Sequence, residues 1–497
     1  MRNILRSLFI VAIAYFIFFP ISNKERAQAQ EPFQWSEPEN LSNTPTTSNH
    51  QAIVTDGYGN VHVFWTEDVG GPELSIEEGE SMPGNTIFYR RWDGESWSVP
   101  VDIIYGRGLT YGYLSAAVDE NNQIYLVWMA FDGLHFSSAP ALNASSAKNW
   151  LNDIVLEPSQ GSRPFIIARG NGELDVLYDT TYQVGNFTKD GNLYHIRSVD
   201  GGMSWSTPLQ ISDIDPNSQT IVLFPHLARD GKGRLHAVWY VGDPPGYTGT
   251  AVFYSRSIDE GETWSEPLKI DEVKPEVSWS SQINIGVIGD NEIHLVWVCG
   301  QLPGRCHQMS QDGGDTWSPI RHVFGDLHSL ANWDALIGDD QGNLYWVLQL
   351  RYPKALYYSY WTGTNWVDPP IILHSRDPYV SEGHSPELAI RNGNELHLIV
   401  RHSRLFEIWH MWAKSPLADP IPAQPTPVTL PTDIPGSTPN AFIPDTRPVS
   451  EVRAPQIGDL PEAASMRPDF SLMIGIASTI LLLVVISLYQ ISGRHRK

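Results

Sequence analysis

The chain has 497 residues, of which 41% are hydrophobic and 11% aromatic, and this composition is typical of a packed globular protein rather than a disordered one. Its formal net charge of −23 argues against a nucleic-acid partner, because binding of phosphates needs a basic surface. An acidic surface also serves solubility in many exported proteins, so the charge does not identify a partner. Nothing in the composition indicates a cofactor, and we expect none.

Residues 1–29 have the pattern of a signal peptide. Arg2 and Arg6 precede an apolar run over residues 8–19, and Ala27-Gln28-Ala29 is a small-x-small cleavage site. The alternative is an uncleaved membrane anchor, since the charged residues 24–26 lengthen the gap between the apolar run and the site. We expect an exported chain that begins directly after this site.

One pattern then recurs along the chain: an apolar strand, a polar turn and a strand rich in His, Val and Trp. It occurs at 53–65, 116–128, 166–178, 227–239, 285–297, 335–347 and 388–400. A period of about 50 to 60 residues is in the range of β-propeller blades. The sequence therefore predicts a repeated all-β architecture.

A second motif, Ser-x-Asp-x-Gly-x-Thr/Ser-Trp, follows three of these repeats, at 198–205, 257–264 and 310–317. The Asp can accept hydrogen bonds from turn amides, the Gly supplies a positive φ, and the Trp covers the hairpin. Shorter copies occur at 92–97 and 361–366. With two strands from each pattern, every repeat supplies a four-stranded blade.

These turns resemble the Asp-box (BNR repeat) of the sialidase-like β-propeller superfamily. In that family the boxes lie on the face away from the active site. The resemblance therefore implies a structural role for six residues here: Asp200, Trp205, Asp259, Trp264, Asp312 and Trp317.

We expect the propeller to occupy residues 30–414 and to have seven blades, with six as the alternative if the irregular second repeat (137–156) is not a blade. The seventh repeat ends at 408–412 without a fourth strand, whereas residues 35–41 copy the blade-closing segment 264–268. The N-terminal strand is therefore expected to close the ring, which removes an open sheet edge.

Functional residues of a propeller are expected around the mouth of the central channel, where inner strands begin and second strands end. The first set comprises His50, Ser115, Arg163, His226, Asn284, Asp334 and Glu387. The second set comprises Glu67, Asp68, Asp132, Asp179, Tyr182, Tyr240, Arg351, Tyr352, Arg401 and His402.

Sialidases hold the substrate carboxylate with three arginines, use a Tyr paired with a Glu as nucleophile, and use an Asp as acid and base. The resemblance implies a candidate for each role: Arg163, Arg351 and Arg401 for the arginines, Tyr352 or Tyr182, Glu387, and Asp132 or Asp68. Arginine forks match a carboxylate at two points. The Phe-Arg-Ile-Pro segment of the family is absent. The segment most similar to it is Ser162-Arg163-Pro164-Phe165, and the similarity is weak, so no motif assigns a catalytic role to a residue of this chain.

Cys299 and Cys306 are the only cysteines, and in an exported chain they predict a disulfide. A metal site is the alternative, with His307 nearby, but two thiols supply only half of a zinc shell. We expect no metal.

Residues 415–469 are rich in proline and predict an extended stalk. Residues 470–489 are almost wholly apolar and predict a transmembrane helix, because about twenty such residues span a bilayer core of about 30 Å. Residues 490–497 form a short basic tail that should be cytoplasmic, with the N-terminal domain outside the cell membrane.

Two functions fit these features. The first is a membrane-anchored extracellular propeller that binds a glycan, a polysaccharide or a cell-surface protein at the channel mouth, with the lipid bilayer as its other partner. The alternative is an exo-sialidase-like glycoside hydrolase that acts on terminal acidic sugars, and the sequence leaves open whether the chain is an enzyme. Arginines beside a Tyr–Glu pair would favour the enzyme, and an aromatic ring around the mouth would favour binding.

Overall fold

The structure is a computed structural model that describes residues 33–427, except 70–83, 131, 152, 159–160, 181–190, 216–217, 219, 244–247, 275–278, 302–303, 326, 328–332, 352–353, 369, 374–382 and 403–404. The predicted signal peptide, transmembrane helix and cytoplasmic tail lie outside the described residues, as does the predicted stalk beyond Pro427. In the described part, no helix has the length and apolarity needed to span a membrane.

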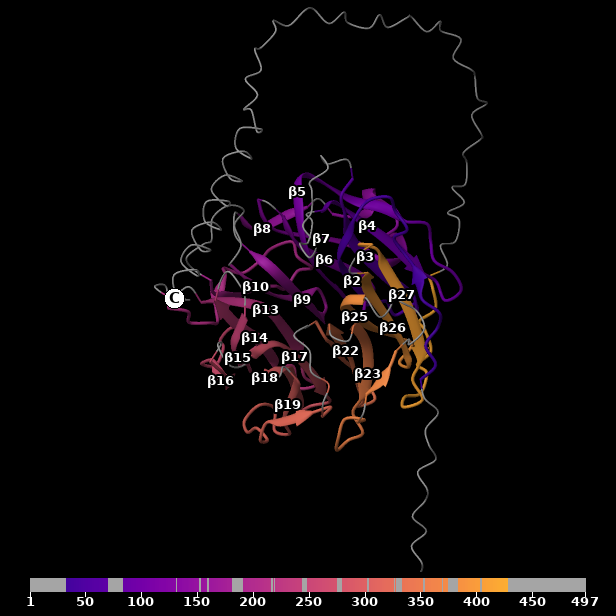
Figure 1. Ribbon diagram of the computed structural model, residues 1–497. Coiled ribbons are helices and arrows are strands. Elements are labelled where there is room, and N and C mark those ends of the chain that lie inside the picture. Colours follow the sequence, from indigo (N-terminus) through magenta and orange to yellow (C-terminus); the bar gives the residue numbers. More distant parts are fainter. Residues whose placement is uncertain are drawn as a thin grey trace, which may run out of the picture. The chain divides into compact units, whose positions relative to one another are not determined.

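The strands form seven four-stranded antiparallel blades around a central axis (Figure 1). The first blade contains β2 (Ser48–Thr55), β3 (Val61–Glu67), β4 (Gly84–Trp92) and the first half of β5 (Val101–Val118). The second half of β5 is the inner strand of the second blade, which continues with β6 (Gln123–Ala130), β7 (Gly133–Pro140) and β8 (Ile154–Pro158). Two short 3-10 turns, η1 (Ala141–Asn143) and η2 (Ala147–Asn149), precede β8.

The next three blades follow the same order from the axis outward. The third contains β9 (Ser162–Gly170), β10 (Glu173–Asp179), β11 (Leu193–Ser198) and β12 (Leu209–Gln210). The fourth contains β13 (Ile221–Arg229), β14 (Leu235–Asp243), β15 (Thr248–Ser257) and β16 (Leu268–Glu272). The fifth contains β17 (Trp279–Ile288), β18 (Glu292–Gly300), β19 (Gly304–Ser310) and β20 (Arg321–Val323).

The last two blades complete the ring. The sixth contains β21 (Ala335–Gly338), β22 (Leu344–Arg351), β23 (Lys354–Tyr360) and β24 (Ile371–Ile372). The seventh contains β25 (Gly383–Arg391), β26 (Glu395–His402), β27 (Ile408–Lys414) and the N-terminal β1 (Glu39–Asn40), which pairs with β27. The predictions of seven blades and of ring closure by the N-terminal strand are both confirmed, and the irregular second repeat is a complete blade.

One tryptophan near the outer strand of each blade packs against an aromatic ring of the preceding blade. In the fourth blade, the ring of Trp264 lies 5.3 Å from that of His195 in an edge-on contact. The other six pairs are Trp97–His410, Trp150–Phe64, Trp205–Phe136, Trp317–Tyr254, Trp366–His307 and Trp35–Tyr358. These tryptophans therefore join neighbouring blades.

The three turns predicted as Asp-boxes share one hydrogen-bond pattern. In the fourth blade, Ser257 Oγ donates to Asp259 at 2.8 Å, and the backbone N–H of Thr263 donates to the same carboxylate at 2.9 Å. The turns around Asp200 and Asp312 repeat both bonds. Hydrogen bonds from Thr316 and Ser310 lower the pKa of Asp312 to about 2. Each carboxylate thus holds its own turn together, as a structural role requires.

The beginning of the predicted stalk is packed on the propeller. Residues 415–427 run over the turns that connect inner and second strands in four consecutive blades. The backbone N–H groups of Ile421 and Gln424 donate to the carbonyls of Asn392 and Gly57, both at 2.7 Å. Gln341 binds the carbonyl of Asp419, and Asn122 binds the side chain of Gln424. This strap, residues 415–427, lies on the face opposite the channel mouth, because inner strands begin at the mouth and end at these turns.

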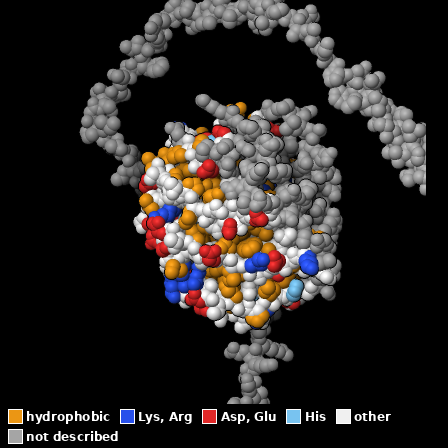
Figure 2. Space-filling model, turned by 90° about the vertical axis from the view of Figure 1, so that its left-hand side faces the viewer, with side chains coloured by type: hydrophobic (Ala, Val, Ile, Leu, Met, Phe, Trp, Pro, Cys, Tyr) orange, Lys and Arg blue, Asp and Glu red, His pale blue; other side chains and the backbone are white. Residues whose placement is uncertain are grey.

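Figure 2 shows one side of the molecule, where acidic, basic and apolar side chains are interspersed. Exposed apolar residues on the outer hairpins of the third and fourth blades include Val199, Met203 and Ile258. In the described part of this side, the basic residues form no continuous field that would suit a polyanion.

Candidate functional site

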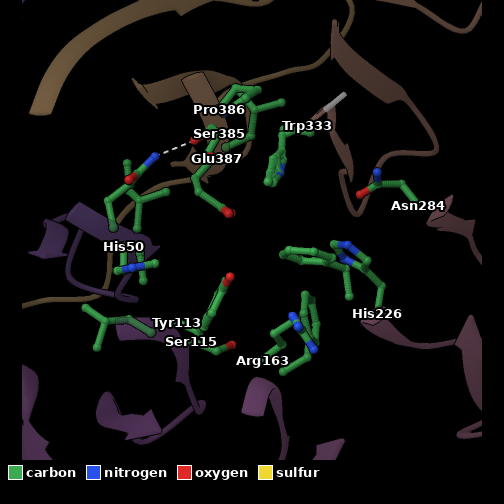
Figure 3. Close-up of a pocket in the computed structure, with 18 of the residues that line it drawn as sticks. His50, Tyr113, Ser115, Arg163, His226, Asn284, Trp333, Ser385, Pro386 and Glu387 are labelled. Carbon is green, nitrogen blue, oxygen red and sulfur yellow. Dashed lines mark hydrogen bonds between the residues drawn. The ribbon is translucent and has the colours of Figure 1, made fainter. Parts of the chain in front are cut away.

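A cavity of about 500 Å³ lies at the mouth of the central channel (Figure 3). Its size is in the range of small-molecule sites. All seven residues that the sequence places at the starts of inner strands line it: His50, Ser115, Arg163, His226, Asn284, Asp334 and Glu387. The inner strands of all seven blades therefore contribute to one pocket.

A β-bulge interrupts the inner strand of six blades where it enters the pocket. At each bulge a residue other than glycine has a positive φ, between 43° and 53°. These residues are His50, Tyr113, Arg163, Phe224, Gln282 and Ser385, and Trp333 occupies the equivalent position two residues before β21. We call these seven residues the bulge ring. Such a backbone conformation costs about 1–2 kcal/mol per residue and is typical of ligand sites.

Three aromatic residues of the bulge ring form a continuous wall, which we call the aromatic wall: Tyr113, Phe224 and Trp333. The ring of Phe224 lies 5.7 Å from that of Tyr113 and 5.0 Å from that of Trp333. His50 continues the wall, with its ring 4.7 Å from Tyr113. The pocket thus has an apolar surface of ring faces and edges.

Arg163 lies against this wall, and its positive charge is balanced by a carboxylate of the protein. Its guanidinium carbon is 5.1 Å from the ring centroid of Phe224, and its Nη1 binds both oxygens of the buried Asp179 at 2.8 and 2.9 Å. Burial opposes the charge of Arg163, but the Asp179 carboxylate outweighs burial, so the pKa of Arg163 rises. The guanidinium is therefore a fixed part of the wall.

Arg401 enters the pocket from the end of β26. Its guanidinium binds the side chain of Asn49 and lies 5.3 Å from the ring centroid of Phe406. Burial lowers the pKa of Arg401 to about 10, which keeps the side chain charged at neutral pH. Of the three arginines suggested by the sequence, Arg163 and Arg401 share the pocket. The Arg351 side chain and Tyr352 lie outside the described residues.

Glu387 extends from β25 into the centre of the pocket, and the hydroxyl of Tyr113 points toward it from the opposite side (Figure 3). The Glu387 side chain is exposed at the pocket, and the protein around it raises the pKa of its carboxyl group by displacing part of its hydration. Among the described residues, neither the Glu387 carboxyl nor the Tyr113 hydroxyl has a hydrogen-bond or ion-pair partner.

The remaining ionisable groups of the pocket are either neutral or paired. Burial lowers the pKa of His226 to about 4, and burial together with Arg401 lowers that of His50 to about 3. Asp334 accepts hydrogen bonds from Arg305 Nε at 2.6 Å and Nη2 at 2.8 Å. At neutral pH, both histidines are therefore neutral and Asp334 is balanced by Arg305.

The comparisons with known proteins are informative about the fold. No family model matches the sequence, and no curated protein is similar enough to count as a relative. An ulvan lyase, described as a new family of polysaccharide lyase and bound to GlcA(1-4)Rha3S, has a TM-score of 0.51 with 10% identity, over 77% of this chain and 98% of that one. The NanB sialidase of Streptococcus pneumoniae has a TM-score of 0.43 with 12% identity, over 80% and 71%.

The chain shares its propeller fold with the ulvan lyase. A protein of unknown function from Dyadobacter fermentans also matches, with a TM-score of 0.49 and 11% identity over 77% of this chain and 99% of that one. Identities this low establish the fold alone, so the chemistry of the pocket has to be argued from its own residues.

Several residues predicted at the ends of second strands do not line the described pocket. The Asp132 carboxylate is 69% exposed and pairs with His135 Nε2 at 2.8 Å, while Asp153 binds the other nitrogen of that ring. Glu67 is buried and accepts hydrogen bonds from Trp65 and Ser48. Asp132 is therefore held outside the pocket by His135, whereas Glu67 fixes the strand ends of the first blade.

The sequence did not indicate Tyr113, Phe224, Gln282, Trp333 or Ser385. The strand pattern instead placed the starts of the inner strands one or two residues later, because it does not reveal a bulge. A signal was present in three blades, where the bulge residue precedes a proline: Arg163-Pro164, Phe224-Pro225 and Ser385-Pro386. Proline in an inner strand marks a bulge, since the ladder hydrogen bond is lost there.

Cys299 and Cys306 form a disulfide between β18 and β19. The Nδ1 of His322 lies 3.7 and 3.6 Å from the two sulfurs. These three residues are the one group of His, Cys, Asp or Glu in the described part of the chain that is close enough to hold a metal ion. A cysteine binds a metal ion as a thiolate, so the two sulfurs of this disulfide are not available as metal ligands.

Proposed function

We propose that the protein binds a carbohydrate, either a glycan or a polysaccharide, in the central pocket. We further propose that it does so outside the cell, as a membrane-tethered propeller. The observation that carries this proposal is the combination of the aromatic wall with two open polar groups, the Tyr113 hydroxyl and the Glu387 carboxyl. A sugar offers apolar C–H faces to aromatic rings and hydroxyl groups to polar side chains, and such mixed pockets bind small polar ligands.

The fold is compatible with this function without determining it. The ulvan lyase of similar fold is bound to a saccharide, GlcA(1-4)Rha3S. Propellers host many unrelated functions, so the proposal depends on the pocket residues. The predicted transmembrane helix at 470–489 supplies the tether.

Replacing Trp333 by Ala is expected to weaken saccharide binding about 30-fold, because a central aromatic contact contributes roughly 2 kcal/mol. Replacing Tyr113 by Phe removes one hydrogen bond and is expected to weaken binding about fivefold. A glycan array on the full-length chain identifies the saccharide, and calorimetry then measures its Kd.

The matched control is Tyr105→Phe, because Tyr105 lies on the same strand as Tyr113 but is 68% exposed and does not line the pocket. Its affinity should equal that of the wild type. Equal affinity of the Trp333→Ala variant would place the sugar elsewhere, and absence of wild-type binding across the array would refute the proposal.

Sialidase-type hydrolysis is the second candidate, and the arrangement of Tyr113 opposite Glu387 with Arg401 in the same pocket favours it. Release of fluorophore from a fluorogenic sialoside would test it, with loss of turnover expected in an Arg401→Ala variant. Absence of turnover by the wild type between about pH 5 and about pH 8 would remove this candidate.

A further inference from the structure

We propose that the strap, residues 415–427, is a clasp that fastens the closure of the propeller ring. It ties the seventh blade to the blades on both sides of it, and it keeps β27 from peeling away from its sheet. This inference concerns the face opposite the pocket, so it does not depend on the proposed carbohydrate ligand.

The closure of the ring is the point at which the propeller needs support. Both ends of the folded chain meet there, because β1 is the outermost strand of the seventh blade and, among the described strands, pairs with β27 alone. The ladder between them has two residue pairs, Glu39–His410 and Asn40–Trp409, and one backbone hydrogen bond extends it on each side. A terminal strand held by so few bonds frays first unless another element fixes it.

The strap crosses the boundary between the two blades that meet at this closure. In the seventh blade, the carbonyl of Asn392 accepts a hydrogen bond from the backbone N–H of Ile421 at 2.7 Å. Three residues later, the backbone N–H of Gln424 donates to the carbonyl of Gly57 at 2.7 Å, in the corresponding turn of the first blade. A segment of the strap only four residues long therefore links the two blades.

Side chains of the next blades on either side hold the strap as well. In the sixth blade, Gln341 Nε2 donates to the carbonyl of Asp419 at 2.6 Å, and its Oε1 accepts from the N–H of the same residue at 2.8 Å. In the second blade, Asn122 Nδ2 donates to Gln424 Oε1 at 3.0 Å. The turns of four consecutive blades thus bind specific groups of the strap.

A glycine in the first blade leaves room for the strap. Gly57 does not have a positive φ, so its backbone conformation does not require glycine. A Cβ at this position would lie 2.7 Å from Nε2 and 2.8 Å from Cδ of Gln424, and 2.9 Å from Oδ1 of Asn122. These distances are shorter than van der Waals contacts, so the turn fits the docked strap best with no side chain at residue 57.

The position of the strap in the chain gives the clasp its effect. β27 ends at Lys414, and the strap begins with the next residue. Any tension or motion of the chain beyond Pro427 therefore reaches the hydrogen bonds of the strap before it reaches β27. Without these bonds, β27 would be peeled from its C-terminal end, and β1 would lose its partner strand.

Hydrogen exchange of the full-length protein in detergent, followed by mass spectrometry, tests the clasp. The variant Ile421→Pro/Gln424→Pro lacks both backbone donors, because proline has no N–H. Exchange in β27 and β1 is expected to become about tenfold faster, as the loss of one or two ordinary hydrogen bonds predicts, whereas β14 of the fourth blade should keep its rate. Thr426→Pro is the matched control, since Thr426 is exposed and makes no hydrogen bond within the described part of the chain.

A second variant loosens the clasp from the side of the propeller and leaves the strap sequence intact. Gln341→Ala removes both bonds to Asp419 and should accelerate exchange in the strap and in β27 about threefold. Its control is Asp340→Ala, because Asp340 lies in the same turn, is exposed, and has no hydrogen bond among the described residues. This control should exchange as the wild type does.

Three results would overturn the clasp. The strap would not be docked if its wild-type amides, including those of Ile421 and Gln424, exchanged as fast as those of an unstructured peptide. It would dock without holding the closure if the double variant left exchange in β1 and β27 unchanged. An equal acceleration in β14 would show a global loss of stability instead of a local one. If the double variant did not fold, Gln341→Ala would decide by the same criteria.

Discussion

An Arg305→Met variant is expected to lose about 3–5 kcal/mol of unfolding free energy, because it leaves a buried carboxylate without its counter-ion. The side chain of Arg305 is 1% exposed and that of its partner Asp334 is 5% exposed. Besides binding both oxygens of Asp334, Arg305 donates to the backbone carbonyl of Gln349 at 3.0 Å. The pair joins β19 of the fifth blade to the start of β21 in the sixth, directly at the pocket wall.

Urea unfolding at neutral pH measures this effect. The double variant Arg305→Met/Asp334→Asn should recover at least half of the loss, since it removes both charges. The control is Arg197→Met, because Arg197 pairs with Glu262 at the surface, where their side chains are 22% and 62% exposed. An exposed pair of this kind contributes less than about 1 kcal/mol. If Arg305→Met cost no more than Arg197→Met, the buried pair would not be the source of stability.

The fold could be predicted from the sequence because its signals are local and repeated. Each blade contains its own strand pattern, and the similarity of residues 35–41 to 264–268 predicted the pairing of β1 with β27. The partner of each outer tryptophan could not be read in the same way. Trp264 contacts His195 across a blade boundary, and a contact between neighbouring repeats leaves no local sequence pattern.

The pocket was located correctly but its composition was incomplete. Inner-strand starts such as Glu387 and His226 do line it. The bulges, however, bring Phe224 and Tyr113 forward, and a bulge depends on a positive φ that bulky side chains rarely adopt. Asp334 illustrates a second limit, because its charge is balanced by Arg305 from another blade. The sequence shows which charged residues lie at the channel mouth, but it does not show which of them form ion pairs with residues of other blades.

The strap shows that a proline-rich composition does not by itself predict an extended segment that makes no contact with the folded domain. Residues 415–427 contain five prolines in 13 residues, which is a higher share than the eight in 42 of the rest of the predicted stalk. They nevertheless make specific backbone hydrogen bonds to Asn392 and Gly57. Proline removes donors, but the intervening residues such as Ile421 and Gln424 keep theirs and can pair with the turns beneath them.

Mild acid is expected to destabilise the fifth blade through a buried pair of histidines. The Nε2 of His294 lies 2.8 Å from a Glu292 oxygen, and a carboxylate accepts, so this nitrogen carries the proton. The Nδ1 of His294 is then the acceptor for His307 Nε2–H at 3.0 Å. His307 is 2% exposed and packs against Trp361 and Trp366, so a second proton on its ring would be buried among indoles.

Burial, with smaller effects from His294 and Arg321, lowers the pKa of His307 from 6.5 to about 3. A lowered pKa means that the neutral ring stabilises the fold above about pH 6.5 and that this contribution is lost as the pH falls toward 3. At about pH 4.5 the loss amounts to about 3 kcal/mol, from about two pH units at 1.36 kcal/mol each.

A His307→Gln variant tests this expectation, because the amide still donates to His294 but does not titrate. Unfolding free energies measured at about pH 7 and about pH 4.5 should differ by about 3 kcal/mol less in the variant than in the wild type. His322→Gln is the matched control, since His322 lies on the adjacent β20 of the same blade but is exposed, and its acid loss should equal that of the wild type. An equal acid loss in the His307→Gln variant would show that His307 accepts its proton without cost, and that the acid sensitivity of the propeller arises at other groups.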